Sequence, residues 1–121
     1  QMLQTEISNI TDIKTQLVKV NMDKFTPTQT EITLDCEPEF LRKKVIILID
    51  DVLNSGRTLI YSLKPFLKTE IKKLQTAVLV KRSYKSFPIA ADYTGYELST
   101  TLQEHIEVIL DDEAKFGVYL Y

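Results

Sequence analysis

Residues 45–59 read VIILIDDVLNSGRTL, and the rest of the chain is arranged around this stretch. Its first five residues are β-favouring and apolar without polar alternation, which predicts a strand buried on both faces of a parallel sheet. Two carboxylates, Asp50 and Asp51, come next, followed by a short polar turn with one glycine and by an amphipathic run. The stretch therefore predicts a strand, a loop and the start of a helix.

The polar part of this stretch predicts a phosphate site. Ligands of open α/β sheets collect at the carboxyl ends of the strands, where Asp50 and Asp51 stand. The turn at 54–58 supplies a glycine without a Cβ, hydroxyl groups on both sides of it and the first free N–H groups of a helix. Carboxylates accept hydrogen bonds from ribose hydroxyls and hold the water molecules of Mg²⁺. The stretch thus suits a ribose 5-phosphate with a divalent metal.

The aspartate pair alone has a simpler interpretation. Asp is a common N-cap residue, so the pair would merely end a buried strand and cap the next helix. A Walker A P-loop is excluded, because the chain has no Gly-x-x-x-x-Gly-Lys-Ser/Thr.

Length and composition indicate one globular domain. The 121 residues are 44% hydrophobic and 26% charged, which is ordinary for a soluble protein with its own core. The net charge of −2 argues against binding polyanions through bulk charge, and the basic clusters at 42–44, 72–73 and 81–85 are typical of solvated faces. No apolar run approaches the length of a membrane span, and the amino end has no signal pattern.

The chain has one cysteine, Cys36, and one histidine, His105. A single cysteine forms no intrachain disulfide, so a cytoplasmic location is expected. Because nothing in the sequence brings the two residues together, we expect neither a Cys/His nucleophile nor a histidine-based metal site.

The first third of the chain predicts a helix and a long loop. Apolar residues of 2–10 fall on one helical face without a start signal, so we expect the end of a longer helix and a missing amino-terminal part. Residues 13–21 predict a strand, and 23–39 predict a loop with a short strand at 31–34. Such a loop is either a lid or a plain connection. Lys24 is its only basic residue and could meet a diphosphate, although nothing else in the sequence indicates this contact.

The rest of the chain predicts alternating elements. Apolar residues at 59–67 form a core-facing helical stripe, which Pro65 should kink or end near Lys64. Residues 74–80 predict a second buried strand, whose following loop lies beside the first loop because parallel strands end at the same edge. We expect a short irregular strand at 90–98, a helical turn at 100–105 and closing strands at 106–110 and 116–121.

These two loops resemble those of a known family. An apolar run, Asp-Asp-Val and then Ser-Gly-x-Thr is similar to the phosphoribosyl diphosphate (PRPP) signature of the type I phosphoribosyltransferases. Residues 77–82 and the segment PIAADYTG at 88–95 resemble the uracil phosphoribosyltransferases that double as pyrimidine-operon attenuation regulators in bacteria. The resemblance covers roughly residues 10–121. It implies that residues 1–121 form one phosphoribosyltransferase domain that lacks its amino-terminal part. The implied fold is a Rossmann-like parallel sheet flanked by helices.

The resemblance also implies roles for residues of both loops. It implies that Asp50 and Asp51 bind the ribose hydroxyls and the waters of Mg²⁺ and are therefore the catalytic residues. The residues implied to bind the 5-phosphate are Asn54, Ser55, Gly56, Arg57 and Thr58. The residues implied to bind the nucleobase are Lys81, Arg82, Pro88 and Ile89.

The implied reaction is a glycosyl transfer of nucleotide salvage. The ribose 5-phosphate of PRPP passes to a ring nitrogen of a nucleobase, a pyrimidine, through an oxocarbenium-like state with release of pyrophosphate. This chemistry needs positioning and charge neutralisation more than an acid or base, which suits a site without histidine. The implied enzyme is a cytoplasmic, Mg²⁺-dependent homodimer.

Departures from the family pattern leave alternatives open. The strand, helix and pyrophosphate loop that family members carry upstream have no counterpart here, so we expect weak or absent catalysis by this chain alone. Lys81 to Ser83 replace the acidic residue and glycine of the family's base loop, and the RNA-binding positions are only partly filled. One alternative is a PRPP-binding regulatory module without turnover that touches RNA through Lys81, Arg82 and Lys85. The other is an α/β domain whose aspartate pair only caps a helix.

Overall fold

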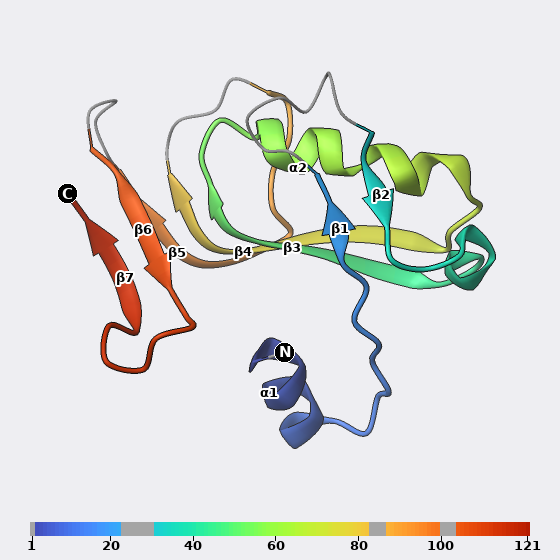
Figure 1. The fold of residues 1–121 in the computed structure, drawn as a ribbon, viewed down its shortest axis with the longest axis horizontal. Coiled ribbons are helices and arrows are strands. Elements are labelled where there is room, and N and C mark those ends of the chain that lie inside the picture. The colour runs from blue at the N-terminus through green and yellow to red at the C-terminus, as the bar shows by residue number, and fades with distance from the viewer. Residues whose placement is uncertain (1, 23–30, 83–86, 100–103) are drawn as a thin grey trace.

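The computed structural model describes residues 2–22, 31–82, 87–99 and 104–121. Its helices and strands follow one another in the order shown in Figure 1. They are α1 (Met2–Ile10), β1 (Val20–Asn21), β2 (Thr33–Leu34), the 3₁₀-helix η1 (Pro38–Leu41), β3 (Val45–Leu53), α2 (Arg57–Ser62), the 3₁₀-helix η2 (Lys64–Lys68), β4 (Lys73–Arg82), β5 (Tyr93–Leu98), β6 (Ile106–Ile109) and β7 (Gly117–Leu120).

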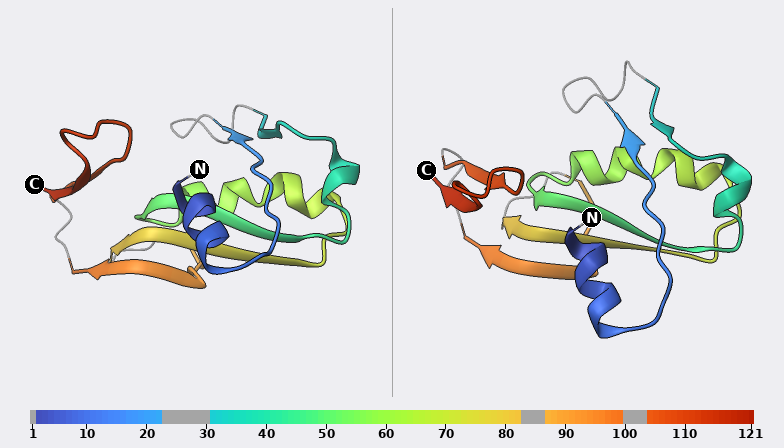
Figure 2. Two further views of the ribbon diagram at one scale, coloured as in Figure 1. Left: turned by 90° about the horizontal axis from the view of Figure 1, so that it is seen from below. Right: turned by 60° about the horizontal axis from the view of Figure 1, so that its bottom comes forward.

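A parallel three-stranded sheet in the order β3-β4-β5 forms the centre of the fold. Ile49 is aligned with Ala77 across the first strand pair, and Ala77 with Tyr93 across the second. The segment expected to be an irregular strand is thus the regular strand β5. Helix α2 and η2 run along one side of the sheet, and α1 lies on the other side (Figures 1 and 2). The predicted α/β fold, a parallel sheet flanked by helices, is confirmed.

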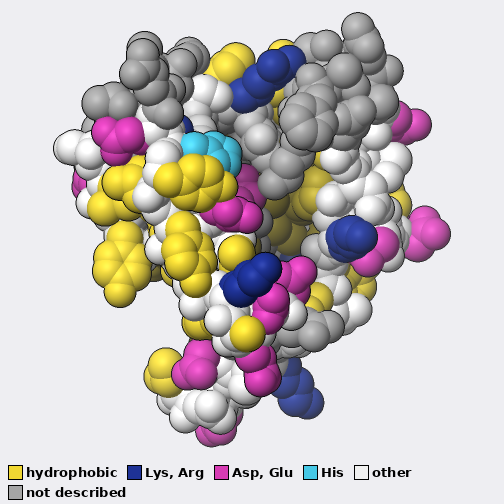
Figure 3. All heavy atoms as spheres, turned by 60° about the vertical axis from the view of Figure 1, so that its left-hand side comes forward, with side chains coloured by type: hydrophobic (Ala, Val, Ile, Leu, Met, Phe, Trp, Pro, Cys, Tyr) yellow, Lys and Arg dark blue, Asp and Glu magenta, His cyan; other side chains and the backbone are white. Residues whose placement is uncertain are grey.

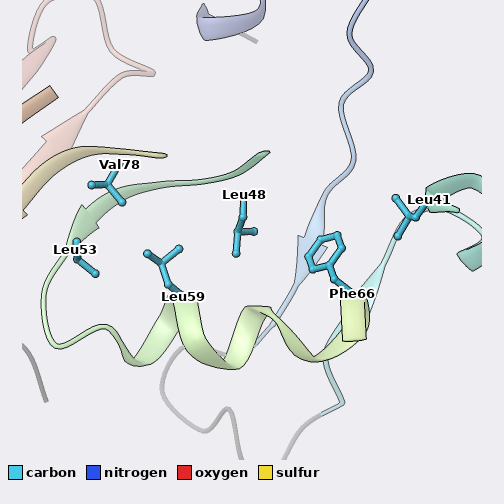
Figure 4. Close-up of a cluster of buried hydrophobic side chains, with 6 residues drawn as sticks. All are labelled: Leu41, Leu48, Leu53, Leu59, Phe66 and Val78. Atoms are coloured by element: carbon cyan, nitrogen blue, oxygen red, sulfur yellow. The ribbon is translucent and has the colours of Figure 1, made fainter. Parts of the chain in front are cut away.

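The hydrophobic core lies between the sheet and α2 with η2 (Figure 4). Full burial of side chains of this kind contributes about 1.5–3 kcal/mol each. The cluster consists of Leu41, Leu48, Leu53, Leu59, Phe66 and Val78.

The other face of β3 is open. Leu48 is buried, whereas Val45, Ile47 and Ile49 are 54%, 45% and 53% exposed. Alternate side chains of a strand point to opposite faces, and α2 covers only the face of Leu48. The prediction that this strand is buried on both faces is therefore wrong, since the side chains of the second face stay about half exposed.

The helix after the first loop breaks where Pro65 predicts. Helix α2 ends at Ser62, and a 3₁₀-helix that contains Pro65 continues the chain. The tighter turn has three residues instead of 3.6, which changes the direction of the side chains that follow. Phe66 is buried as expected, but Leu67 is 77% exposed, so the predicted core stripe is wrong at that position.

The remaining strands form two small antiparallel pairs. The strand expected at 13–21 is limited to β1, which pairs with β2 inside the expected segment 31–34. Strands β6 and β7 lie within the two predicted closing segments and pair with each other. Lys24 and most of the helical turn expected at 100–105 lie outside the described residues. None of the helices in the described ranges is long and apolar enough to cross a membrane.

Two residues of the segment at 88–95 fix β5 against β4. The N–H of Thr76 donates to Asp92 Oδ2 at 2.8 Å, and the N–H of Asp92 donates to the carbonyl oxygen of Thr76 at 3.0 Å. At Gly95 an added Cβ would lie 2.5 Å from the backbone oxygen of Leu79. The glycine therefore permits the close approach of the two strands.

Replacement of Gly95 by alanine is expected to lower the free energy of unfolding by about 1–3 kcal/mol, because the new Cβ forces β4 and β5 apart. Urea unfolding measures the change. Thr94→Ala, at the exposed neighbouring position of β5, is the matched control. Equal losses in the two variants would contradict this account of Gly95.

Candidate functional site

The two aspartates lie within β3 rather than after it, because the strand continues to Leu53. Asp50 is half-buried on the face of Leu48, and Asp51 is exposed. The backbone N–H of Asp51 donates to Asp50 Oδ1 at 2.9 Å, and that of Val52 donates to Asp51 Oδ1 at 2.7 Å. In each bond a carboxylate oxygen accepts from the backbone N–H of the next residue, and a carboxylate has about four acceptor sites in all.

Neither aspartate caps a helix. The N-cap of α2 is Gly56, six residues after Asp50, and it makes no side-chain cap hydrogen bond. The interpretation of the aspartate pair as a helix cap is therefore wrong. The positions of these carboxylates in a strand need another explanation.

Gly56 gives the turn after β3 its shape. Its φ of 89° is left-handed, a conformation that glycine adopts without steric cost. An added Cβ would also lie 2.6 Å from Ile89 Cγ2. Next to it, the N–H of Arg57 donates to Ser55 Oγ at 3.3 Å, which leaves the hydroxyl hydrogen of Ser55 available to a ligand.

Asp50 and the whole turn line one shallow hollow at the carboxyl end of β3. The structure thus brings Asp50 together with all five residues predicted for the 5-phosphate. Asp51 is not among the residues that line it. The hollow combines a carboxylate with hydroxyl and N–H donors, which is a suitable set for a sugar phosphate.

The segment after β4 packs against this turn, as the parallel order predicts. The N–H of Phe87 donates to the carbonyl oxygen of Ser55 at 3.0 Å, and Ile89 lies over Gly56. The ring of Phe87 also meets that of Tyr61 edge-on, with centroids 6.3 Å apart. The two predicted loops are therefore neighbours, although residues 83–86, including Lys85, lie outside the described part.

The four residues predicted for the nucleobase occupy different environments. Ile89 contacts the turn, and Pro88 is exposed. Lys81 Nζ lies 3.4 Å from Glu97 Oε1 on the neighbouring strand. Arg82 is buried against the turn at 54–58, on the same face of β4 as Val78 and Val80. The alternation of the strand could have indicated this inward direction.

The remaining reactive groups lie elsewhere. Burial, and then the charges of Asp35 and Glu37, raise the pKa of the Cys36 thiol, which makes it a weaker nucleophile at neutral pH. The ring of His105 packs against that of Tyr121, with centroids 5.4 Å apart. Exposed apolar side chains gather beside this histidine (Figure 3).

A metal site made of protein ligands alone is not present in the described ranges, where no group of three or more His, Cys, Asp or Glu residues is placed to hold one. Mg²⁺ commonly binds one or two carboxylates together with water and substrate phosphates. The chemistry of Asp50 and Asp51 fits that mode of binding.

Comparison with protein families gives a match over most of the chain. Residues 4–113 match the phosphoribosyl transferase domain. The bifunctional protein PyrR of Bacillus mycoides and that of Bacillus cereus are each 37% identical to this chain over 86 residues, and each match covers 68% of this chain and 48% of the relative. The chain thus spans about half the length of these curated relatives.

Solved structures of similar fold are phosphoribosyltransferases. A hypoxanthine phosphoribosyltransferase of Trypanosoma cruzi, in complex with the product IMP, has a TM-score of 0.71 and 14% identity, and the match covers 93% of this chain and 54% of that chain. The hypoxanthine phosphoribosyltransferase of Staphylococcus aureus has a TM-score of 0.64 and 16% identity, with 83% and 57% covered. At these identities the likeness shows the fold alone.

Proposed function

Because the chain belongs to the phosphoribosyl transferase domain family, we propose that it binds PRPP and transfers the ribose 5-phosphate to a nucleobase, with release of pyrophosphate. The observation that carries the proposal is the hollow in which Asp50 adjoins the turn at 54–58. The lining of this hollow offers both acceptors for ribose hydroxyls and donors for a phosphate.

Each part of the site has a proposed task. Asp50 accepts hydrogen bonds from the ribose hydroxyls, and Asp50 and Asp51 hold Mg²⁺ through water. The hydroxyls of Ser55 and Thr58, the guanidinium of Arg57, and the backbone N–H groups of the turn donate to the 5-phosphate, as does the amide of Asn54. Mg²⁺, when bound, neutralises charge on the departing pyrophosphate.

The reaction consists of one exchange at C1 of the ribose. The bond from C1 to the pyrophosphate oxygen breaks, a bond from C1 to the ring nitrogen forms, and the proton of that nitrogen is released. The residues of this chain bind and orient the ribose phosphate, so that the base approaches the opposite side of C1. Such positioning is a large part of the catalysis that a site of this kind supplies.

The base is proposed to be a pyrimidine, held by the segment after β4 with Lys81, Arg82, Pro88 and Ile89. With PRPP and Mg²⁺, uracil is therefore expected to give a nucleotide and pyrophosphate, slowly, whereas hypoxanthine gives neither. Pyrophosphate release together with chromatography of the nucleotide measures both. Faster turnover of hypoxanthine would overturn the pyrimidine assignment and leave the PRPP site standing.

The regulatory alternative shares the PRPP site and differs in having no turnover and in touching RNA. Two of the three residues named for RNA contact are engaged within the chain. Lys81 is paired with Glu97, and Arg82 is buried. These placements count against the RNA contact of the alternative, and they limit direct contact of Lys81 and Arg82 with a base in the same way. The homodimer, the cytoplasmic location and the single domain over 1–121 stay predictions, and light scattering measures the first of them.

A further inference from the structure

Arg82 connects three segments that are far apart in the sequence. It is the last residue of β4, and only 8% of it is exposed. Its Nη1 donates to Asn54 Oδ1 at 3.2 Å, and its Nη2 donates to the backbone oxygen of Glu104 at 3.0 Å. One side chain thereby joins the turn after β3, the end of β4 and the segment that leads into β6.

A guanidinium is well suited to this place. It stays charged at all ordinary pH values and carries five donors in a planar fork, so it can bond to two acceptors at once. Burial of a charge is tolerated where hydrogen bonds replace the lost water. Lysine has the same charge, but its compact ammonium does not reproduce the two directions of the fork.

We propose that Arg82 is a positioning residue of the phosphate site, which acts through Asn54 to hold the turn at 54–58 in the conformation that receives the 5-phosphate of PRPP. The inference rests on the proposed function. Because Oδ1 of Asn54 accepts from Arg82, the orientation of the side-chain amide is fixed. Its NH₂ group then points away from Arg82. The nearby positive charge also favours an anion at the turn.

A second contact from the same segment supports this role. The N–H of Phe87 bonds to the carbonyl oxygen of Ser55, one residue after Asn54. The end of β4 and the segment that follows it thus hold the turn at two consecutive residues. Arg82 fixes a side chain of the turn, while Phe87 fixes its backbone.

The test is a double-variant cycle on PRPP affinity. Arg82→Lys and Asn54→Ala are each expected to weaken PRPP binding in the presence of Mg²⁺ roughly tenfold, as a small misplacement of a binding group does. The double variant is expected to bind PRPP no more weakly than Asn54→Ala, because both changes remove the same hydrogen bond. Lys73→Met, at the exposed opposite end of β4, is the matched control and is expected to bind as the unchanged chain does.

Calorimetric titration gives the dissociation constants, and thermal unfolding of each variant shows that the titrations are made on folded protein. Losses that multiply in the double variant would overturn the proposal. So would an Arg82→Lys chain that unfolds at a lower temperature but binds PRPP with unchanged affinity while folded, since Arg82 would then have a structural role alone.

A second readout needs no ligand. In Arg82→Lys, the amide hydrogens of Phe87 and Ile60, which donate to the carbonyl oxygens of Ser55 and Gly56, are expected to exchange with solvent roughly tenfold faster, while those of Leu48 and Val78 in the sheet stay unchanged. Absence of PRPP binding by the unchanged chain would refute the proposed function, and the exchange rates would still decide whether Arg82 holds the turn. Unchanged exchange at Phe87 and Ile60 would overturn the inference even where PRPP binds.

Discussion

Replacement of Asp50 and Asp51 together by asparagine is expected to abolish Mg²⁺-dependent binding of PRPP, with a loss of affinity of about 100-fold or more. Asparagine keeps the size of the side chain and one acceptor oxygen, but it removes the two negative charges that hold the waters of the metal. Calorimetric titration of PRPP in the presence and absence of Mg²⁺ measures the loss. Of the two single variants, Asp50→Asn is expected to cause the larger loss of PRPP affinity, because Asp50 lines the hollow and Asp51 does not.

The chain contains its own matched control. Asp111 and Asp112 are a second adjacent pair of aspartates, exposed in the β6–β7 hairpin. Their joint replacement by asparagine removes the same total charge and is expected to leave PRPP binding unchanged. If the variant of Asp50 and Asp51 bound PRPP as tightly as this control, the assignment of the ribose site to β3 would be wrong.

Gly56→Ala is expected to damage both the fold and the site. The φ of 89° disfavours any residue with a Cβ, and that Cβ would lie 2.6 Å from Ile89 Cγ2. Together these effects should lower the free energy of unfolding by about 2–4 kcal/mol, and the displaced turn should bind PRPP at least about tenfold more weakly. Urea unfolding and calorimetry measure the two losses.

A second variant separates the two causes. Ile89→Ala removes the atom that the new Cβ would meet, so the pair Gly56→Ala/Ile89→Ala is expected to recover part of the stability relative to the sum of the single changes. The double variant still has an alanine at the left-handed φ of residue 56, so the strain of that conformation remains. A Gly56→Ala chain with unchanged stability and unchanged affinity would contradict the structure of the turn.

The central unit of the fold could be predicted from sequence because its signals are local. An unbroken apolar run, a glycine in a polar turn and a proline inside a helical pattern each determine the backbone within a few residues. Which side chains of the sheet are buried depends on residues far away in the sequence and not on local signals. Whether Ile47 is buried depends on what lies over β3, which the strand's own residues do not encode, and the prediction failed there.

The candidate site also has features that could be predicted from the sequence and features that could not. Residue type and spacing indicated Asp50 and the turn, and the rule for parallel strands placed the two loops side by side. The contacts of Arg82 with Asn54 and of Ile89 with Gly56 depend on side-chain packing between residues about thirty positions apart. The sequence therefore indicated the neighbourhood of these residues but not their contacts.

The central claim is that the hollow at the carboxyl end of β3 is a PRPP site. The most direct test is a calorimetric titration of PRPP into the chain of residues 1–121 in the presence of Mg²⁺, with ribose 5-phosphate as a second ligand. The account predicts saturable binding of one PRPP per chain, weakened when Mg²⁺ is removed, and weaker binding of ribose 5-phosphate at the same site. A folded chain that takes up neither ligand would contradict it.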